Sequence, residues 1–226
     1  MKKTMPKVLI VVGALSLIAA GVLTAYTYID DYLADQRARD ILDQVEYVGW
    51  KTMELTEPED LFYPVRDADE LENPDDEPYP EDTENSGEPI KFDILGILEI
   101  PKLKRKLPVL DRSQRSLLNI SVCRFSGKVE KKPIRLIIAG HNYRSHFGLI
   151  HTLEIGDVVL FRMPDGETYR YSVIRLETCH VSEKEAVHAG DDWDITMITC
   201  QKPERTMRHV VRCKEIPEVL APELTA

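Results

Sequence analysis

Short apolar runs separated by turn-forming residues fill the second half of the chain. Runs of this length that are rich in Val, Ile, Leu and Tyr indicate β-strands, and Pro164-Asp-Gly166 between two of them is typical of a hairpin turn. A short helix is expected up to Ile120, with Ser113 as its N-cap. The expected strands are 93–100, 107–110, 134–139, 157–161, 168–176, 194–200 and 208–214. About seven or eight short strands with few helices predict an all-β fold, a closed or nearly closed barrel.

A different pattern opens the chain, because Val8 to Tyr28 are 21 residues without a charge. As a helix at ~1.5 Å per residue this run spans ~31 Å, close to the ~30 Å thickness of a membrane's hydrocarbon core. The apolar core of a signal peptide is shorter, roughly 7–15 residues, so a retained anchor is favoured over a cleaved signal. Lysines before the run and aspartates after it favour an inside N-terminus. We expect residues 1–28 to anchor a single-pass cell-membrane protein whose remaining residues are extracellular.

Residues 29–53 are expected to form a juxtamembrane helical stalk. Ile29, Leu33, Ile41 and Val45 recur at roughly helical spacing among charged residues. The favoured interpretation is a solvated continuation of the anchor helix, and the alternative is a helix that docks on the following domain.

Residues 54–90 form an acidic, proline-rich segment with 15 acidic residues and one basic residue, Arg66. Low hydrophobicity and high charge predict a disordered linker. As a random coil it would span ~35 Å root-mean-square, and it would then tether the following domain to the anchor and supply its reach. The alternative is a lid, in which Leu61-Phe-Tyr63 or Tyr79 folds back over that domain.

The charge pattern changes again after this segment. Residues 91–226 carry 22 Lys or Arg and 18 Asp or Glu, and the basic residues are scattered without interleaved aromatics. This pattern excludes a nucleic-acid-binding surface. We expect a single catalytic or binding domain over 91–216, followed by a short tail, 217–226.

The last two expected strands bring a cysteine and an arginine together. Cys200 ends one strand and Arg208 begins the next. Thr196, Ile198 and Cys200 alternate onto one strand face, so the thiol is expected at the rim of a sheet. A cysteine attacks as its thiolate, and a free thiol has a pKa of ~8.5, so a nearby imidazole or positive charge is needed.

His141 is the best-placed candidate for that imidazole, because it follows a buried strand and Gly140 in an expected loop. The other histidines are interpreted as packing, surface or strand residues: His146, His151, His180, His188 and His209. The spacing of four residues between His141, His146 and His151 matches no helical face and lacks paired cysteines, so no metal site is expected.

Several motifs, in order, resemble those of the sortase family. They are Gly96-Ile-Leu-Glu-Ile-Pro101, Leu107-Pro-Val109, Ala139-Gly-His-Asn142, Phe147-Gly-Leu-Ile-His-Thr-Leu153, Gly156-Asp157 and Thr196-Met-Ile-Thr-Cys200 followed by Arg208. The family's cysteine motif reads Thr-Leu-x-Thr-Cys, with a catalytic arginine on the next strand and a histidine on an earlier loop. The resemblance covers about 93–216 and implies a closed eight-stranded sortase-type β-barrel with short helices, preceded by the N-terminal transmembrane helix.

The resemblance also implies a function. Cys200 would be the nucleophile that cleaves an LPXTG-like sorting signal, His141 the general acid and base, and Arg208 the group that stabilises the oxyanion. The implied substrate-contacting residues are Ala139, Asn142, Thr196, Ile198 and Thr199. The implied partners are secreted proteins with a C-terminal sorting signal and an amine acceptor on a lipid-linked peptidoglycan precursor or a pilin. No cofactor is implied.

Departures from the family pattern leave two questions open. Met197 stands where leucine is usual, and Arg205 and Arg212 also lie near Cys200, so Arg208 is chosen by its place in the motif with Arg212 as the alternative. The lid and second membrane segment of the pilin-assembling class and the helical insertion of the haem-related class are not matched, so the class stays open.

Functions outside the family fit the sequence less well. An exported L,D-transpeptidase would carry Ser-x-Gly-Cys-x-Arg around its cysteine, and a papain-like peptidase would place its cysteine before its histidine. A non-catalytic, anchored binding barrel would need no Cys-His-Arg set.

The resemblance makes residues 182–193 the substrate-recognition loop. Asp191, Asp192 and Asp194 could bind calcium there, but a solvated acidic loop is favoured. Three further cysteines, Cys123, Cys179 and Cys213, are expected to be buried free thiols, with a Cys179–Cys213 disulfide as the alternative.

Overall fold

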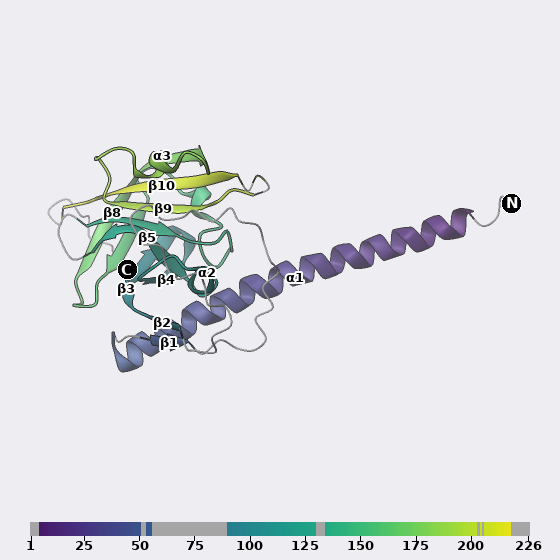
Figure 1. Ribbon diagram of the computed structural model, residues 1–226, viewed down its shortest axis with the longest axis horizontal. Coiled ribbons are helices and arrows are strands. Elements are labelled where there is room, and N and C mark those ends of the chain that lie inside the picture. Colours follow the sequence, from purple (N-terminus) through teal and green to yellow (C-terminus); the bar gives the residue numbers. More distant parts are fainter. Residues whose placement is uncertain are drawn as a thin grey trace.

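The computed structural model describes residues 5–50, 53–55, 90–129, 134–202, 204 and 206–217. Eight strands close into a barrel in the order β10-β8-β7-β3-β4-β5-β6-β9 (Figure 1). They are β3 (Ile94–Ile100), β4 (Arg105–Leu110), β5 (Val122–Lys128), β6 (Arg135–Ala139), β7 (Val158–Arg162), β8 (Thr168–His180), β9 (Ile195–Cys200) and β10 (Met207–Glu215). The closed eight-stranded barrel predicted from the sequence is confirmed.

Helices other than the first are short, as predicted. They are the 3-10 turns η1 (Pro101–Leu103) and η2 (Ile150–Thr152) and the α-helices α2 (Arg115–Leu118) and α3 (Lys184–His188). The predicted cap of α2 is wrong by one residue, because Gln114 is the N-cap and makes no side-chain capping bond. The long first helix, α1, runs from Met5 to Val48.

Strand β5 is the barrel strand that the sequence pattern did not predict. It pairs in parallel with β4 and antiparallel with β6, so it completes the barrel between two strands that were predicted. Strand β8 is also longer than expected and continues to His180, where it pairs with the start of β10. These two differences explain how seven predicted runs become a closed eight-stranded sheet.

Two layers of apolar side chains follow from strand alternation on β6, β9 and β10. Leu136, Ile138 and Met197 belong to the cluster inside the barrel. Ile198 and Val210 belong to a second cluster on the outer face, which the segment containing α3 covers (Figure 1). These strands are therefore buried on both faces, and the outer apolar face lies beside the last residues of β6 and β9.

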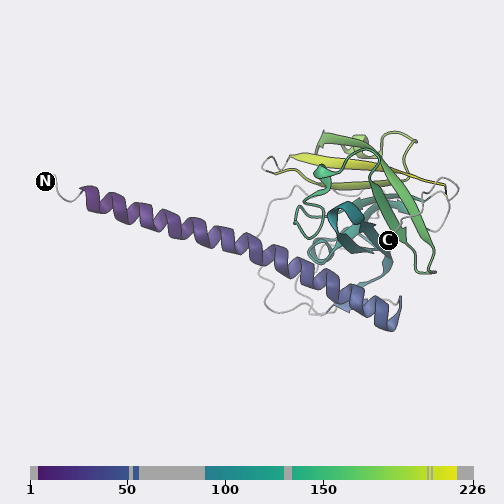
Figure 2. The same cartoon turned by 180° about the vertical axis from the view of Figure 1, so that it is seen from behind.

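The second half of α1 docks on the barrel, so the interpretation of residues 29–53 as a solvated stalk is wrong. Figures 1 and 2 show α1 passing the barrel on the side of α2 and β4. Ala34, Ala38, Ile41 and Val45 are buried there, and the last two join a cluster with residues of β2, β3 and α2. Burying one such isoleucine or valine contributes about 1.5–3 kcal/mol. This half of α1 is part of the folded domain.

The two ends of the acidic segment lie side by side in the structure. Strand β1 (Met53–Leu55) follows α1 and pairs antiparallel with β2 (Ile90–Phe92), with Leu55 opposite Ile90. The two ends of the segment are therefore neighbours, and its length adds nothing to the distance between α1 and the barrel. The prediction that it supplies reach is wrong. The prediction of disorder over 54–90 is wrong at residues 54, 55 and 90, which lie in β1 and β2. The rest of that segment, the lid predicted from 61–63 or Tyr79, and most of the tail 217–226 lie outside the described residues.

The first half of α1 makes no comparable contact. Its large apolar side chains between Leu9 and Ile29 are exposed. Within the described residues, α1 is the one helix that is long and apolar enough to cross a membrane. Its composition changes from this exposed apolar half to the amphipathic docked half within a continuous helix.

Docking of α1 can be tested through one buried side chain. Ile41→Ala is expected to lower the free energy of unfolding by about 3 kcal/mol, because it leaves a cavity between α1 and the barrel. Leu33→Ala on the same helix is the control, since Leu33 is 41% exposed. The measurement is urea unfolding of the full chain in detergent, followed by tryptophan fluorescence. Equal small losses for the two variants would contradict the docking.

Candidate active site

Parallel pairing of β6 with β9 places His141 beside Cys200. Ala139 is the register partner of Ile198, and the Gly140 amide continues the ladder by donating to the Ile198 carbonyl at 3.1 Å. His141 and Cys200 each follow this pair by two residues. Because neighbouring strands lie ~4.8 Å apart, the two residues stand side by side at one end of the barrel.

Arg208 stands on the other side of Cys200. The two residues are direct partners in the antiparallel pairing of β9 with β10, so their side chains share a face of the sheet. Arg208 is 4% exposed, and its guanidinium also donates to the Met207 carbonyl at 3.2 Å. The structure thus brings the three predicted catalytic residues together in the order His141, Cys200, Arg208.

Two of the predicted substrate-contacting residues hold the site together. Thr199 lies on the opposite face of β9 from Cys200, is 3% exposed, and donates its hydroxyl to the Gly140 carbonyl at 2.8 Å. The side-chain amide of Asn142 donates to the Cys200 carbonyl. Both bonds tie the loop that carries His141 to the end of β9. The expectation that Thr199 lines a substrate surface is wrong, because its hydroxyl faces this loop.

The remaining predicted contact residues differ in depth. Ala139 is partly exposed and packs against the outer apolar cluster, which contains Ile198. Thr196 shares their face, but its side chain is completely buried. Ala139 and Ile198, together with Val210 of β10, form an apolar strip that reaches Cys200. Ile198 and Val210 are 1% and 2% exposed, so Ala139 is the partly exposed member of this strip.

A cavity of about 440 Å³ continues the outer face toward the start of β6. Its walls come from the end of β5, the start of β6 and the segment after α3. It is lined by Ser126, Gly127, Lys128, Arg135, Ile137, His188, Gly190 and Trp193. No sequence motif marked this cavity, because its lining comes from three separate segments.

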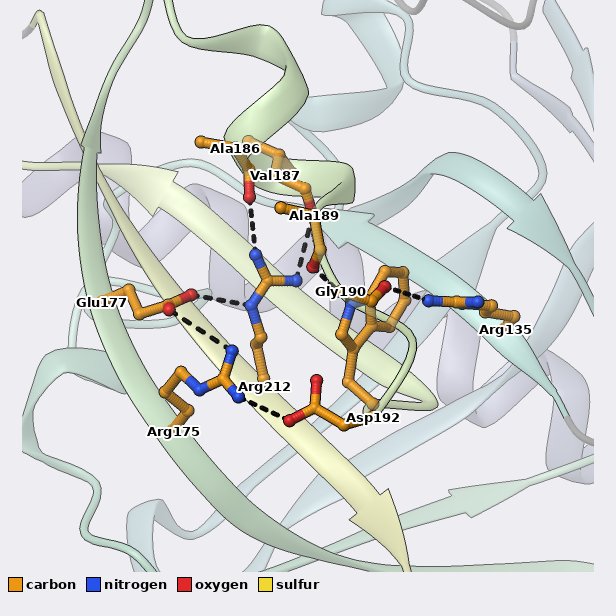
Figure 3. Close-up of polar contacts among 10 residues, drawn as sticks. Arg135, Arg175, Glu177, Ala186, Val187, Ala189, Gly190, Asp192 and Arg212 are labelled. Carbon is orange, nitrogen blue, oxygen red and sulfur yellow. Dashed lines mark hydrogen bonds and ion pairs between the residues drawn. The ribbon is translucent and has the colours of Figure 1, made fainter.

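Arg212 anchors the α3 segment over the outer face (Figure 3). Its guanidinium donates to the carbonyls of Ala186 and Val187 at 2.6 and 3.2 Å and pairs with Glu177 at 2.7 Å. Arg212 is 1% exposed and lies opposite Thr196, four residues along β10 from Arg208. Its hydrogen-bonding groups are directed at α3 and at Glu177 on β8, so the structure favours Arg208 over Arg212 as the arginine beside Cys200.

Arg135 and the indole of Trp193 also hold the α3 segment in place. The guanidinium carbons of Arg135 and Arg212 lie 4.5 and 5.4 Å from the ring centroid of Trp193. The indole N–H donates to the Ala189 carbonyl at 2.9 Å, and Arg135 donates to the Gly190 carbonyl. The segment predicted to recognise substrate is thus fixed to β6 and β10 by several charge-assisted contacts.

The prediction of a solvated acidic loop agrees with Asp191 and Asp192, which are exposed, and is wrong for Asp194, which is buried. Asp192 pairs with Arg175. Asp194 is 3% exposed and accepts from the Lys214 ammonium at 2.9 Å and the Glu215 amide at 2.7 Å. In the part of the chain that the structure describes, no cluster of three or more His, Cys, Asp or Glu residues could hold a metal ion.

The other histidines have neighbours away from Cys200. His151 and His209 stack on each other with ring centroids 5.3 Å apart. His180 contacts Ser182, and His188 packs near Phe125. His146 is fully buried, and burial lowers its pKa to about 3, with a smaller lowering from His141. His146 is therefore neutral at physiological pH, which agrees with its predicted packing role.

Cys200 is the accessible thiol. All four cysteines are free, and Cys200 is the partly exposed one. Burial raises the pKa of the Cys123 and Cys179 thiols, and it raises that of Cys213 to about 12. Buried thiols of this kind stay protonated and unreactive. The prediction of buried free thiols is confirmed, and the alternative Cys179–Cys213 disulfide is wrong.

The anchoring role of Arg212 predicts a large effect of its removal. Arg212→Met should lower the free energy of unfolding by about 3 kcal/mol, because it leaves the Glu177 carboxylate and two buried carbonyls without their donor. Arg175→Met is the matched control, since that side chain is 42% exposed and should cost at most about 1 kcal/mol. Chemical denaturation of the full chain measures both. Similar losses in the two variants would count against the anchor.

Comparison with known proteins agrees with this geometry. The model of the Sortase domain family matches residues 98–216. No curated protein matches the chain. Solved structures with the same fold include a lid mutant of sortase A from Corynebacterium diphtheriae, with 20% identity over 56% of this chain and 72% of that one and a TM-score of 0.50.

Two structures of sortase C enzymes give similar values. Streptococcus agalactiae sortase C1 in complex with MTSET is 19% identical over 55% of this chain and 70% of its own, with a TM-score of 0.50. Streptococcus pneumoniae sortase C is 20% identical over 55% and 69%, with a TM-score of 0.50. At these identities the neighbours establish the fold, and the family model covers more than half of the chain. The chain belongs to the sortase family of cysteine transpeptidases.

Proposed function

We propose that this sortase is anchored in the cell membrane by α1, cleaves an LPXTG-like sorting signal at Cys200, and transfers the cleaved protein to an amine. The observation that carries the proposal is the adjacency of His141, Cys200 and Arg208 on neighbouring strand ends. A nucleophile, a proton carrier and a fixed cation within reach of one another are the groups that an acyl transfer from an amide needs.

The first half-reaction forms a thioester. The Cys200 sulfur attacks the carbonyl carbon of the threonine in the Thr–Gly bond, and the carbonyl oxygen gains negative charge. Arg208, directly across from Cys200, would donate hydrogen bonds to this oxygen. As the C–N bond breaks, protonated His141 gives its proton to the departing glycine nitrogen, so the leaving group departs as a neutral amine.

The second half-reaction reverses the proton transfer. An incoming amine attacks the thioester carbonyl and loses a proton to the now neutral His141, while the Cys200 thiolate leaves. The product is a new amide, and His141 and Cys200 return to their starting states. The acceptor would be an amine on a lipid-linked peptidoglycan precursor or on a pilin.

The surroundings of Cys200 support an extended apolar peptide as substrate. Ala139 and Ile198 form an apolar strip that ends at Cys200, and the cavity near Trp193 continues the same face. A sorting signal lying along this face would present its leucine and proline to Ala139, the partly exposed member of the strip, and to the cavity. Its carrier would be a secreted protein with a C-terminal signal.

The position of the enzyme follows from α1. The lysines that precede the uncharged run and the aspartates that follow it favour an inside N-terminus, so the barrel would lie outside the cell. The docked half of α1 would hold the barrel close to the membrane surface. Membrane-retained substrates and lipid-linked acceptors would both reach it there.

The nucleophile is tested with the full chain in detergent and a fluorogenic Leu-Pro-x-Thr-Gly peptide. Cleavage is expected, and hydroxylamine should accelerate it by resolving the thioester. Cys200→Ala should abolish turnover and keep the wild-type melting temperature, whereas Cys123→Ala is expected to retain turnover. A trapped acyl group on Cys200, seen by mass spectrometry, would identify the intermediate. Wild-type rates in Cys200→Ala would exclude this mechanism.

The choice of Arg208 has a separate test. Arg208→Lys keeps the charge but loses the planar set of donors, so kcat is expected to fall by about 100-fold. Arg175→Lys, an exposed arginine on the adjacent β8, is the control and should stay within about twofold of the wild type. Peptide turnover and the rate of acyl-enzyme formation are measured for both. An unchanged kcat in Arg208→Lys would remove Arg208 from the mechanism.

A further inference from the structure

The juxtamembrane turn of α1 contacts the loop that carries His141. The Oδ1 atom of Asp31 accepts hydrogen bonds from both the amide and the hydroxyl of Ser145, each at 2.9 Å. Asp31 follows the uncharged run of α1 by only a few residues. A carboxylate that accepts two donors from one residue fixes that residue more firmly than a single neutral bond would.

The loop between Ser145 and His141 is held by its own backbone. The amides of His146 and Gly148 donate to the Tyr143 carbonyl at 3.1 and 2.7 Å, and the Phe147 amide donates to the His141 carbonyl at 3.2 Å. A Cβ at Gly148 would lie 2.6 Å from the Tyr143 carbonyl oxygen, so the turn is closed tightly. Displacing Ser145 would therefore displace the bonds that hold His141.

Side chains form a second connection. The rings of His141 and Tyr143 have centroids 5.2 Å apart, and those of Tyr143 and His146 are 5.4 Å apart in an edge-to-face arrangement. His146 is fully buried, and neither of its ring nitrogens has a hydrogen-bond partner among the described residues. The row of rings thus connects His146, the residue after Ser145, to His141.

Docking of α1 does not depend on Asp31. Ile41 and Val45 bury their side chains two or more turns further along, and Arg37 donates to the Asn119 carbonyl at 3.3 Å. The contact between Asp31 and Ser145 lies outside this apolar seam. Its specific effect is on the loop of residues 140–150 rather than on attachment of the helix.

We propose that Asp31 is a positioning residue for His141: by fixing Ser145, it holds the His141 loop beside Cys200. The inference rests on the proposed function of His141 as the proton carrier. The helix that anchors the enzyme would then also help to position a catalytic residue. A misplacement of about 1 Å can cost about 100-fold in an enzyme's rate, so partial loosening of one loop should give a measurable loss.

The experiment uses the full chain in detergent micelles. Asp31→Ala is expected to lower kcat about tenfold with KM unchanged within twofold, because the substrate strip on Ala139 and Ile198 is untouched. Alkylation of Cys200 by iodoacetamide at pH 7 should slow about threefold, since a displaced imidazole promotes the thiolate less well. Asp31→Asn keeps an acceptor oxygen for Ser145 and should recover at least half of the lost kcat.

Asp40→Ala is the matched control, because Asp40 lies on the same helix with an exposed side chain. It should match the wild type in kcat and alkylation rate. An Asp31→Ala enzyme whose kcat lies within twofold of Asp40→Ala would overturn the inference. An equal loss of kcat in Asp31→Asn and Asp31→Ala would also overturn it, because the oxygen that asparagine keeps as an acceptor for Ser145 would then have no effect on catalysis.

Two further measurements keep the result decisive. If Asp31→Ala lowers the melting temperature, the Ser145→Ala variant is measured instead, because it removes only the hydrogen bond from the Ser145 hydroxyl. About a threefold loss of kcat in this variant would support the inference, and no loss would overturn it. The wild type and Cys200→Ala are assayed first. A wild-type enzyme without Cys200-dependent turnover contradicts the proposed function itself, whereas an active wild type with an indifferent Asp31→Ala contradicts only the role of Asp31.

Discussion

The parallel ladder between β6 and β9 is the constraint on which the site depends. Strands that come from distant parts of the sequence are locked in register from Leu136 and Ile195 to Ala139 and Ile198. The Thr199 hydroxyl and the Gly140 amide extend this register by one residue beyond the last pair. A shift of one residue would turn every side chain to the other face. The apolar layers on both sides of these strands make such a shift costly, so the barrel's packing fixes the placement of the thiol and the imidazole.

Much of this site was predictable from local patterns. The alternation of side chains along a strand predicted that Ile198 and Cys200 share one face. Arg208 begins the next strand after a short connection, so it was expected to lie opposite Cys200. His141 required more than alternation, because the pairing of β6 with β9 is nonlocal. Its place after a buried strand and Gly140 made it the best candidate among the histidines, and the ordered motifs then selected it. Thr199 was assigned to substrate from its place in a motif, although its parity already directed it to the opposite face.

The features that the sequence did not predict have physical reasons. Strand β5 reads Val-Cys-Arg-Phe-Ser-Gly-Lys, and its central arginine and late glycine break the expected alternation. The docked face of α1 begins with Ala34 and Ala38, small residues that allow close approach without forming a visible hydrophobic stripe. Strands β1 and β2 are three residues each, too short to show a pattern, so the pairing of the two ends of the acidic segment was not expected. Each of these errors concerns a contact between segments far apart in the chain.

The unbroken course of α1 has a consequence for which bonds the enzyme can cut. With α1 anchored in the membrane as proposed, its direct continuation onto the barrel would fix the height of the Cys200 sulfur above the bilayer. A membrane-retained substrate would have to bring its scissile bond to that height. The number of residues between the bond and the substrate's own hydrophobic segment would then be selected along with the signal itself. Two proteins with identical signals but different spacers would be sorted at different rates.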